Sequence, residues 1–182
     1  MPVLLEAVSV IVRRASIERV FPGGLADFVA LVPNETLCVD DDLARVGFMD
    51  PDDAAEFIDV LEECGLRCLD DDGRAQDIAV GDQVKGLTTP CDWAEWYRVD
   101  HFKSGMKIAA CRLKGSASWD VALPAGWDYE RSLSKRFIYV AEGAENPMVP
   151  LEHGGRVEAY LDTTTGREVF MGRVPSEGGE RA

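Results

Sequence analysis

The segment from Cys91 to His101 holds, within eleven residues, the residue types that nucleophilic catalysis needs. Cys91 could supply a thiolate, and His101 could act as its base. Asp92 or Asp100 could then orient the imidazole. The spacing matches no known catalytic signature, and a thiolate needs a positive environment that an acidic chain does not favour. The alternative is that Cys91 is a buried thiol in an aromatic core.

The same segment is rich in large aromatic side chains. Trp93, Trp96 and Tyr97 fall within it, and all four tryptophans of the chain lie between residues 93 and 127. Tryptophan and tyrosine combine a large apolar area with one polar group. Such a cluster lines a pocket or a partner surface when it is exposed, and fills a core when it is buried. The sequence leaves both possibilities open.

No other catalytic, cofactor or metal motif is complete. The chain contains no G-x-G-x-x-G, G-x-S-x-G or H-E-x-x-H string. Asp70 and Gly73 resemble the middle of a calcium loop. That loop needs acidic ligands where Cys68 and Ala79 stand, so the segment is better read as a hairpin turn. We therefore expect neither a metal ion nor a cofactor.

The charge of the chain is strongly negative and unevenly distributed. Residues 1–90 contain 19 of the 33 acidic side chains and only seven basic ones, so they carry most of the net charge of −14. Such a field repels nucleic acid and anionic membranes and attracts basic proteins. The five cysteines are odd in number and scattered, which favours reduced thiols and a cytoplasmic location. No apolar run is long enough for a transmembrane helix.

Residues 51–63 are predicted to form an acidic, amphipathic helix. Asp50 can cap this helix, Pro51 suits its first position, and Gly65 can end it. One side of the helix is apolar, whereas the rest is almost entirely acidic. The carboxylates that we expect to face a partner are Asp52, Glu56, Asp59 and Glu63.

Arg13 and Arg14 form a basic exception within this acidic half. They stand where a predicted strand meets a helix that begins near Ser16. Backbone N–H groups at a helix start and bidentate guanidinium groups together favour the binding of a small anion. The alternative is that both arginines pair with nearby carboxylates.

The fold class indicated by the first eighty residues is α+β. The order is β-α-β-β-α-β with one extra strand, which is typical of a ferredoxin-like split βαβ arrangement with both helices on one face of the sheet. The other face must be covered by the C-terminal half or by a second subunit. The predicted elements are a strand at 3–12, a broken helix pair at 17–32, a hairpin at 36–49, the helix at 51–63, and strands at 66–69 and 75–80.

The remaining chain is predicted to consist of antiparallel strands. We expect a ferredoxin-like subdomain at 1–86, packed on an antiparallel β-rich subdomain at 87–174, and a mobile tail at 175–182. The candidate strands are 97–102, 106–113, 119–123, 136–141, 157–161 and 169–171.

The function that these features favour is a non-catalytic, acidic module that binds a basic protein partner and could inhibit or neutralise it. Two alternatives remain. The first is a regulatory sensor that binds a small anion at Arg13 and Arg14, with a homodimer formed through the sheet face or its edge. The second is an enzyme that uses Cys91 and His101.

Overall fold

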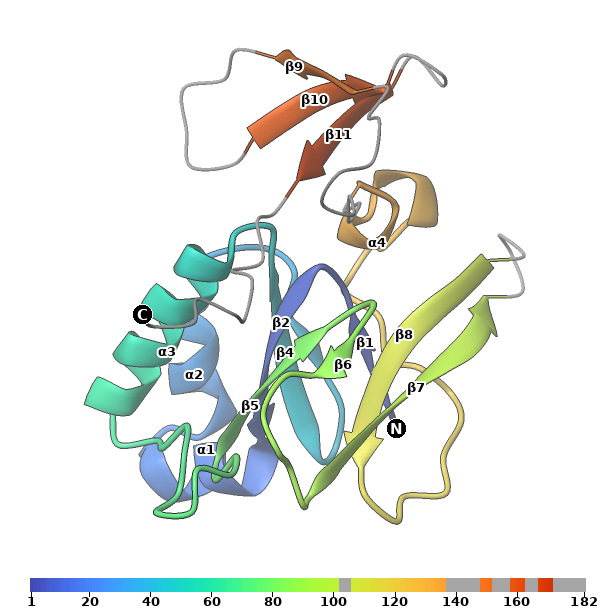
Figure 1. Cartoon of the computed structure of the whole chain (residues 1–182). Helices are drawn as coiled ribbons and strands as arrows, with labels where there is room; N and C mark the ends of the chain where they lie inside the picture. The colour runs from blue at the N-terminus through green and yellow to red at the C-terminus, as the bar shows by residue number, and fades with distance from the viewer. Residues whose placement is uncertain (102–105, 137–147, 152–157, 163–166, 172–182) are drawn as a thin grey trace, which may run out of the picture.

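A computed structural model describes residues 1–101, 106–136, 148–151, 158–162 and 167–171. Its largest sheet has five strands in the order β3-β4-β2-β5-β6, and every neighbouring pair is antiparallel (Figure 1). The fold class is therefore α+β with antiparallel sheets, as predicted. The strands are β2 (Val8–Arg13), β3 (Cys38–Val39), β4 (Leu43–Phe48), β5 (Ile78–Asp82) and β6 (Gly86–Leu87).

Three helices cover one face of this sheet (Figure 1). They are α1 (Arg14–Val20), α2 (Leu25–Leu31) and α3 (Pro51–Glu63). Their apolar sides pack on one face of β2, β4 and β5, and Phe28, Phe57 and Leu61 are among the buried residues of this core. The broken helix pair is confirmed, because α1 and α2 are separated by the turn that contains Pro22.

The start and the end of α3 agree with the signals read from the sequence. The Asp50 side chain accepts a hydrogen bond from the backbone N–H of Asp52 at 2.9 Å, and Pro51 occupies the first helical position. Gly65 follows the last turn with a φ of 104°, a conformation that suits glycine. Local chemistry alone therefore defines this helix.

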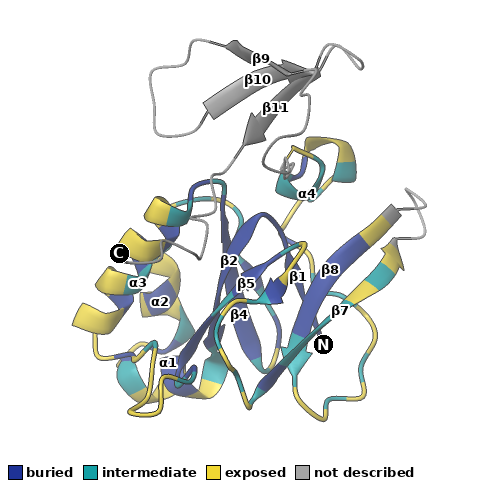
Figure 2. Cartoon of the chain, viewed as in Figure 1, coloured by how far each residue is buried: buried dark blue, intermediate teal, exposed yellow. Residues whose placement is uncertain are grey.

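A second, three-stranded sheet covers the other face of the five-stranded sheet (Figures 1 and 2). Its order is β1-β8-β7, formed by β1 (Val3–Leu5), β8 (Met106–Leu113) and β7 (Ala94–His101). The core between the sheets takes residues from both halves of the chain, such as Ile11, Ala79, Ala109 and Cys111. A homodimer through this sheet face is not supported, because the C-terminal half already covers it.

Three of the predicted strands, at 3–12, 66–69 and 75–80, are wrong in extent. The strand predicted at 3–12 is broken into β1 and β2 at Glu6 and Ala7, and the φ of Ala7 is 43°. The hairpin predicted around Asp70 is reduced to one bridge, between Leu69 and Ala75, because aspartate side chains supply hydrogen bonds that a strand ladder would otherwise make. The strand that follows begins only at Ile78.

The structure of the C-terminal part contains the predicted strands near 97–102 and 106–113, and it confirms the hairpin predicted from 157 to 171. β7 pairs with β8 along its full length, and β10 (Glu158–Asp162) pairs with β11 (Arg167–Met171) and with β9 (Met148–Leu151). The segment at 119–123 is not a strand but makes one bridge, from Val3 to Ala122. The predicted strand at 136–141 and the tail at 175–182 lie outside the described residues, apart from Arg136, which ends α4 (Leu133–Arg136).

A buried ion pair joins the two halves of the molecule. Arg45 on β4 is fully buried, and its Nη2 lies 3.2 Å from Oε2 of Glu6, which is also buried. The guanidinium also donates to the carbonyl oxygens of Leu4 and Thr36. The other carboxylate oxygen of Glu6 accepts from Nε1 of Trp127 at 2.9 Å and from Ser134. One carboxylate thus fixes both the strand break and the segment around Trp127.

Replacing Glu6 with alanine should lower the free energy of unfolding by about 3–5 kcal/mol, because it leaves the buried Arg45 without a counter-charge. Glu18→Ala serves as the control, since it breaks an exposed ion pair with Arg14 and should cost less than about 1 kcal/mol. Urea denaturation followed by circular dichroism measures both changes. Equal effects of the two substitutions would contradict the structural role of Glu6.

Candidate functional site

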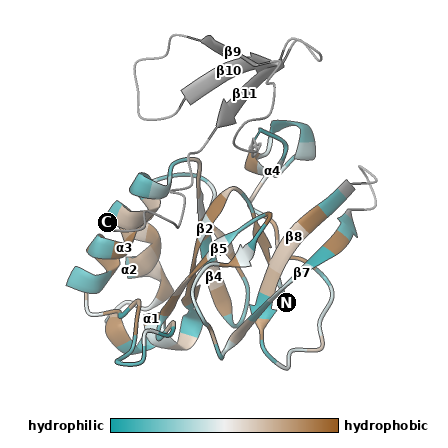
Figure 3. Cartoon of the chain, in the orientation of Figure 1, coloured by the Kyte–Doolittle hydropathy of each residue, from teal (hydrophilic) through white to brown (hydrophobic). Residues whose placement is uncertain are grey.

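The outer face of α3 is an exposed acidic surface. The helix packs its apolar residues on the sheet, and its hydrophilic side is turned to solvent (Figure 3). The four predicted partner-facing residues are all exposed, as are two further acidic residues of the helix. We call this set of side chains the α3 acidic face: Asp52, Asp53, Glu56, Asp59, Glu62 and Glu63.

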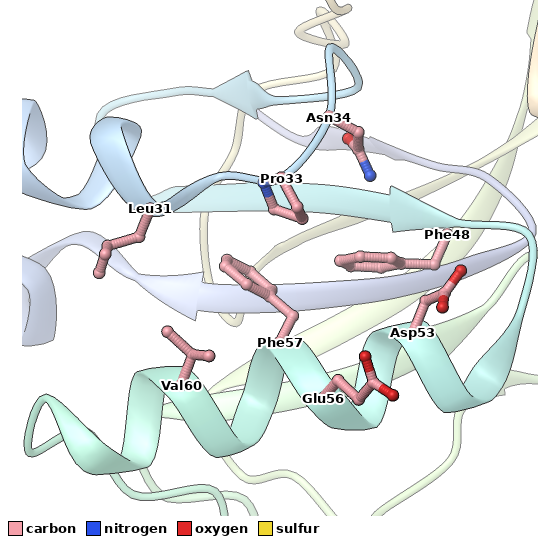
Figure 4. A pocket seen from close by; sticks show the side chains of 8 residues that line it. All are labelled: Leu31, Pro33, Asn34, Phe48, Asp53, Glu56, Phe57 and Val60. Carbon is pink, nitrogen blue, oxygen red and sulfur yellow. The ribbon is translucent and has the colours of Figure 1, made fainter.

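A pocket of about 370 Å³ lies beside this face (Figure 4). Its size falls within the range of small ligand and side-chain pockets, roughly 300–1,000 Å³. Carboxylates of α3 stand at one end, and apolar side chains from α2, α3 and β4 form the rest together with Pro33 and Asn34 of the loop after α2. The lining residues are Leu31, Pro33, Asn34, Phe48, Asp53, Glu56, Phe57 and Val60.

The floor of the pocket is part of the core. The rings of Phe48 and Phe57 lie 5.6 Å apart and are almost fully buried, and Phe57 also contacts Phe28 at 6.3 Å. Val60, by contrast, is 40% exposed at the pocket wall. A floor that is packed on the core does not need to be ordered when a partner binds, which favours binding.

Helical spacing brings carboxylates and apolar groups together on this wall. Asp53 precedes Phe57 by four residues, and Glu56 precedes Val60 by four, so each pair shares one side of the helix. The place of Asp53 in the pocket was not predicted from the sequence. The i,i+4 spacing was the signal that could have found it.

The opposite wall is held by Asn34. Its side-chain amide donates to the carbonyl oxygen of Gly47 at 3.0 Å, and its Oδ1 accepts from the hydroxyl of Thr36 at 2.6 Å. These bonds attach the loop between α2 and β3 to the neighbouring β4. The pocket therefore lies between two fixed elements, the Asn34 loop and α3.

Two turns rich in aspartate, at residues 40–42 and 70–72, differ in whether their carboxylates are exposed to a partner. Asp40 is buried, and its carboxylate accepts from the backbone N–H groups of Asp42 and Leu43, at 2.8 and 2.5 Å. It stabilises its own turn. Asp70 is exposed and accepts from two backbone N–H groups in the same way, while Asp71 is also exposed.

The anion site predicted at Arg13 and Arg14 is not formed as a shared position. Arg14 pairs with Glu18 at 3.0 Å and donates to the carbonyl oxygen of Asp40. The Arg13 guanidinium instead lies 5.7 Å from the ring centroid of Trp93. For Arg14, pairing with a nearby carboxylate is the arrangement adopted.

A neighbouring arginine anchors α1 to the sheet. Arg19 lies 2.8 Å from the carboxylate of the buried Asp77, which also accepts from the Ser16 hydroxyl and the backbone N–H of Arg67. Burial acts to raise the pKa of Asp77, but the hydrogen bonds from Ser16 and Arg19 outweigh burial and lower it. The charged carboxylate is thus the favoured form.

The aromatic segment is divided between two faces of β7. Trp96 packs against the core between the sheets, and Trp93 donates its Nε1–H to the carbonyl oxygen of Ala75 at 2.9 Å. Tyr97 points to the other face, as strand alternation requires, and its ring lies 5.8 Å from that of Trp119. Trp119, which follows this segment, is 67% exposed, whereas the other three tryptophans are partly buried.

The structure does not bring together the proposed catalytic residues. Cys91 precedes β7, whereas His101 ends it, and at roughly 3.3 Å per residue the strand separates its ends by more than about 20 Å. Asp92 is bound by Arg74, with Oδ2 and Nε 2.6 Å apart, and this hydrogen bond lowers the pKa of the carboxyl group. The described geometry therefore lacks a nucleophile beside its base.

Comparisons of the chain with protein-family models, curated proteins and solved structures give no match. Among the described residues, no group of three or more His, Cys, Asp or Glu side chains is arranged to hold a metal ion. Nor does any helix in the described ranges have the length and hydrophobicity to cross a bilayer. The site is therefore interpreted from its geometry alone.

Thiol labelling should follow exposure rather than a special reactivity of Cys91. Cys64 is exposed and should react first with a mild electrophile, whereas Cys38 and Cys111 are buried and burial raises the pKa of both thiols. Mass spectrometry after timed labelling gives the order. Faster labelling of Cys91 than of Cys64 would favour the enzymatic hypothesis instead.

Asp77→Asn should destabilise the fold at pH 7, because the folded state holds the carboxylate with a lowered pKa. A lowered pKa stabilises the folded state above the unfolded value of about 3.9, and that contribution disappears as the pH falls through the folded pKa. The difference from wild type in urea unfolding should therefore shrink below about pH 4. Asp71→Asn, at an exposed position, is the control and should show no such trend.

Proposed function

We propose that the chain is a non-catalytic module that binds a basic protein through the α3 acidic face and the pocket beside it. By covering a positively charged surface, it inhibits or neutralises that partner. The observation that carries the proposal is the apolar pocket of about 370 Å³ with two carboxylates at its rim. Charge alone would be equally consistent with a solubilising surface, whereas a preformed apolar pocket beside the charge fits recognition.

Three aspartates of the α3 acidic face support intermolecular pairing. The ion pairs found among the described residues involve none of Asp52, Asp53 and Asp59. These side chains project from a helix whose other side is fixed in the core. Basic groups of a partner would therefore meet preoriented negative charge, which speeds association and makes it sensitive to salt.

The pocket defines the apolar part of the partner. Its floor accommodates one aliphatic or aromatic side chain, and its rim places Asp53 and Glu56 beside that chain. The complementary motif is an apolar residue flanked by lysine or arginine. An anchor in a fixed pocket surrounded by charge is the usual arrangement of a binding hot spot.

The aromatic segment has a smaller place in this proposal than the sequence suggested. Trp93 and Trp96 contribute to the core between the sheets, on the side of the five-stranded sheet opposite the helices. They cannot provide the anchor next to α3. The alternative hypothesis is an enzyme that uses Cys91 and His101. No contact among the described residues favours it.

We also propose that residues 8–82 form a ferredoxin-like split βαβ unit. The order β2, α1 with α2, β3, β4, α3, β5 supports this assignment, as does the placement of β2 between β4 and β5. β3 has only two residues, and β6 adds an extra strand at the opposite edge. A boundary at residue 86, with separate subdomains on either side, stays a prediction.

Replacing Asp52 and Asp59 with asparagine should weaken binding of the basic partner and flatten its salt dependence. Asp100 and Asp120 replaced with asparagine form the control, since this variant loses the same charge from exposed sites outside α3. We expect the association rate to fall about tenfold in the first variant only. Pull-downs from a lysate of the organism that encodes the chain, at low and moderate salt, identify the partner by mass spectrometry, and surface plasmon resonance then measures the rates.

A second variant tests the pocket independently of net acidity. Val60→Lys places a positive charge at the exposed pocket wall and should abolish binding, whereas Val29→Lys makes the same change at an exposed position of α2 outside the pocket lining. If both lysine variants bind like wild type, the pocket takes no part in recognition. If the Asp52/Asp59 variant and the Asp100/Asp120 control lose equal affinity, only the net charge matters and the proposed site is wrong.

A further inference from the structure

A second, smaller pocket lies between the turn after β5, the β7-β8 hairpin and the segment from η1 (Tyr129–Arg131) to α4. Its volume is about 140 Å³, well below the roughly 300 Å³ at which pockets for drug-sized ligands begin. The lining includes the apolar residues Ile108 and Ala109, and most of the other lining residues are polar or charged. A space of this size suits a small polar ion.

Two cationic side chains line this pocket, although the chain as a whole carries a net charge of −14. Arg98 stands on β7 and Lys107 on β8, and the register places Arg98 opposite Ala109 and Lys107 opposite Asp100. All four therefore lie on the same face of the strand pair. The ion pairs in the described part of the chain include neither Arg98 nor Lys107.

Two contacts with described residues hold Arg98 in position, and neither is with a carboxylate. Its Nη2 donates to the carbonyl oxygen of Val84 at 3.4 Å, and its guanidinium lies 5.7 Å from the ring centroid of Trp96. Neither contact neutralises its charge. The remaining N–H groups of the Arg98 guanidinium can donate to an oxyanion, and Lys107 supplies a second positive charge.

The neutral wall of the pocket is fixed by hydrogen bonds. The Oε1 atom of Gln83 accepts from the backbone N–H of Ala7 at 2.7 Å, and its Nε2 donates to the carbonyl oxygen of Ser134 at 3.4 Å. The Ser134 hydroxyl lies 3.2 Å from a carboxylate oxygen of Glu6. This wall is therefore preorganised, so an anion that binds there does not have to order it.

We propose that this pocket binds a small phosphate oxyanion, either inorganic phosphate or the phosphate group of a small metabolite. The pocket is too small to enclose a whole nucleotide, and two cations of different geometry suit a tetrahedral anion, to which arginine can donate bidentately. The anion-binding function that the sequence placed at Arg13 and Arg14 belongs to Arg98 and Lys107. This proposal does not depend on the partner-binding role of α3.

The test is a thermal unfolding series with sodium phosphate against sodium chloride at equal ionic strength. Phosphate also stabilises folded proteins in general because it is excluded from their surface, so the variants below separate that general effect from binding in the pocket. The melting temperature should rise by about 3 °C when phosphate is present at about ten times its Kd. No difference between phosphate and chloride would overturn the proposal.

Variants locate the effect in the pocket. Arg98→Gln and Lys107→Gln should each remove most of the phosphate-dependent shift, measured against the same variant in chloride. Lys114→Gln is the matched control, because it removes one charge from an exposed lysine just beyond the other end of β8. If the control loses the shift as well, or if Arg98→Gln and Lys107→Gln both keep it, the assignment is wrong.

Further ligands distinguish the sources of the phosphate group. A larger shift with ribose 5-phosphate than with inorganic phosphate would identify a phosphorylated metabolite as the ligand class, and a smaller one would identify the free ion. Isothermal titration calorimetry with the same two probes gives the affinities. An equal shift with sodium acetate would overturn the proposal, because it would show a site for small anions in general.

Discussion

The buried ion pair between Glu6 and Arg45 is the interaction on which the rest of the structure depends. Removing two charges from water is costly, and the cost is offset here because nearly every polar atom of the pair has a hydrogen-bond partner. These partners come from β1, the loop before β3, and the segment around Trp127. Parts of the chain that are far apart in sequence must therefore meet at one point before the pair is stable.

The position of Glu6 explains why the N-terminal strand serves two sheets. The carboxylate and Ala7 interrupt the strand, so β1 pairs with β8 while β2 pairs with β4 and β5. Ala7 takes a left-handed conformation that costs roughly 1–2 kcal/mol for a residue with a side chain. Hydrogen bonds between Ala7 and Gln83 in both directions hold it there. The same Gln83 then reaches Ser134 and forms the fixed wall of the smaller pocket.

Prediction from sequence succeeded where short-range chemistry decides the structure. The cap at Asp50 and the break at Pro22 both depend on residues within a few positions of each other. It failed where a distant partner decides: Glu6 lies in an apolar run, and nothing nearby indicates that Arg45 neutralises it. The pockets were missed for the same reason, since each joins three segments that only the tertiary fold brings together. The pair of Arg14 with Glu18 belongs to the short-range cases, because its i,i+4 spacing is local and agrees with the expected pairing of Arg14 with a nearby carboxylate.

The distribution of charge on α3 is difficult to explain by folding alone. Asp52 and Glu56, and likewise Asp59 and Glu63, are like charges four residues apart, and each such pair costs roughly 0.2–0.5 kcal/mol. The last turn ends in Glu62 and Glu63 with no basic residue, so it also opposes the helix dipole. Elsewhere in the first half, four arginines pair with carboxylates, and the paired residues are Arg14, Arg19, Arg45 and Arg74. Among the described residues, the ion pairs thus involve acidic groups outside α3, and none of them includes Asp52, Asp59 or Glu63. A bound basic surface would relieve this repulsion and would occupy the pocket that the same helix lines.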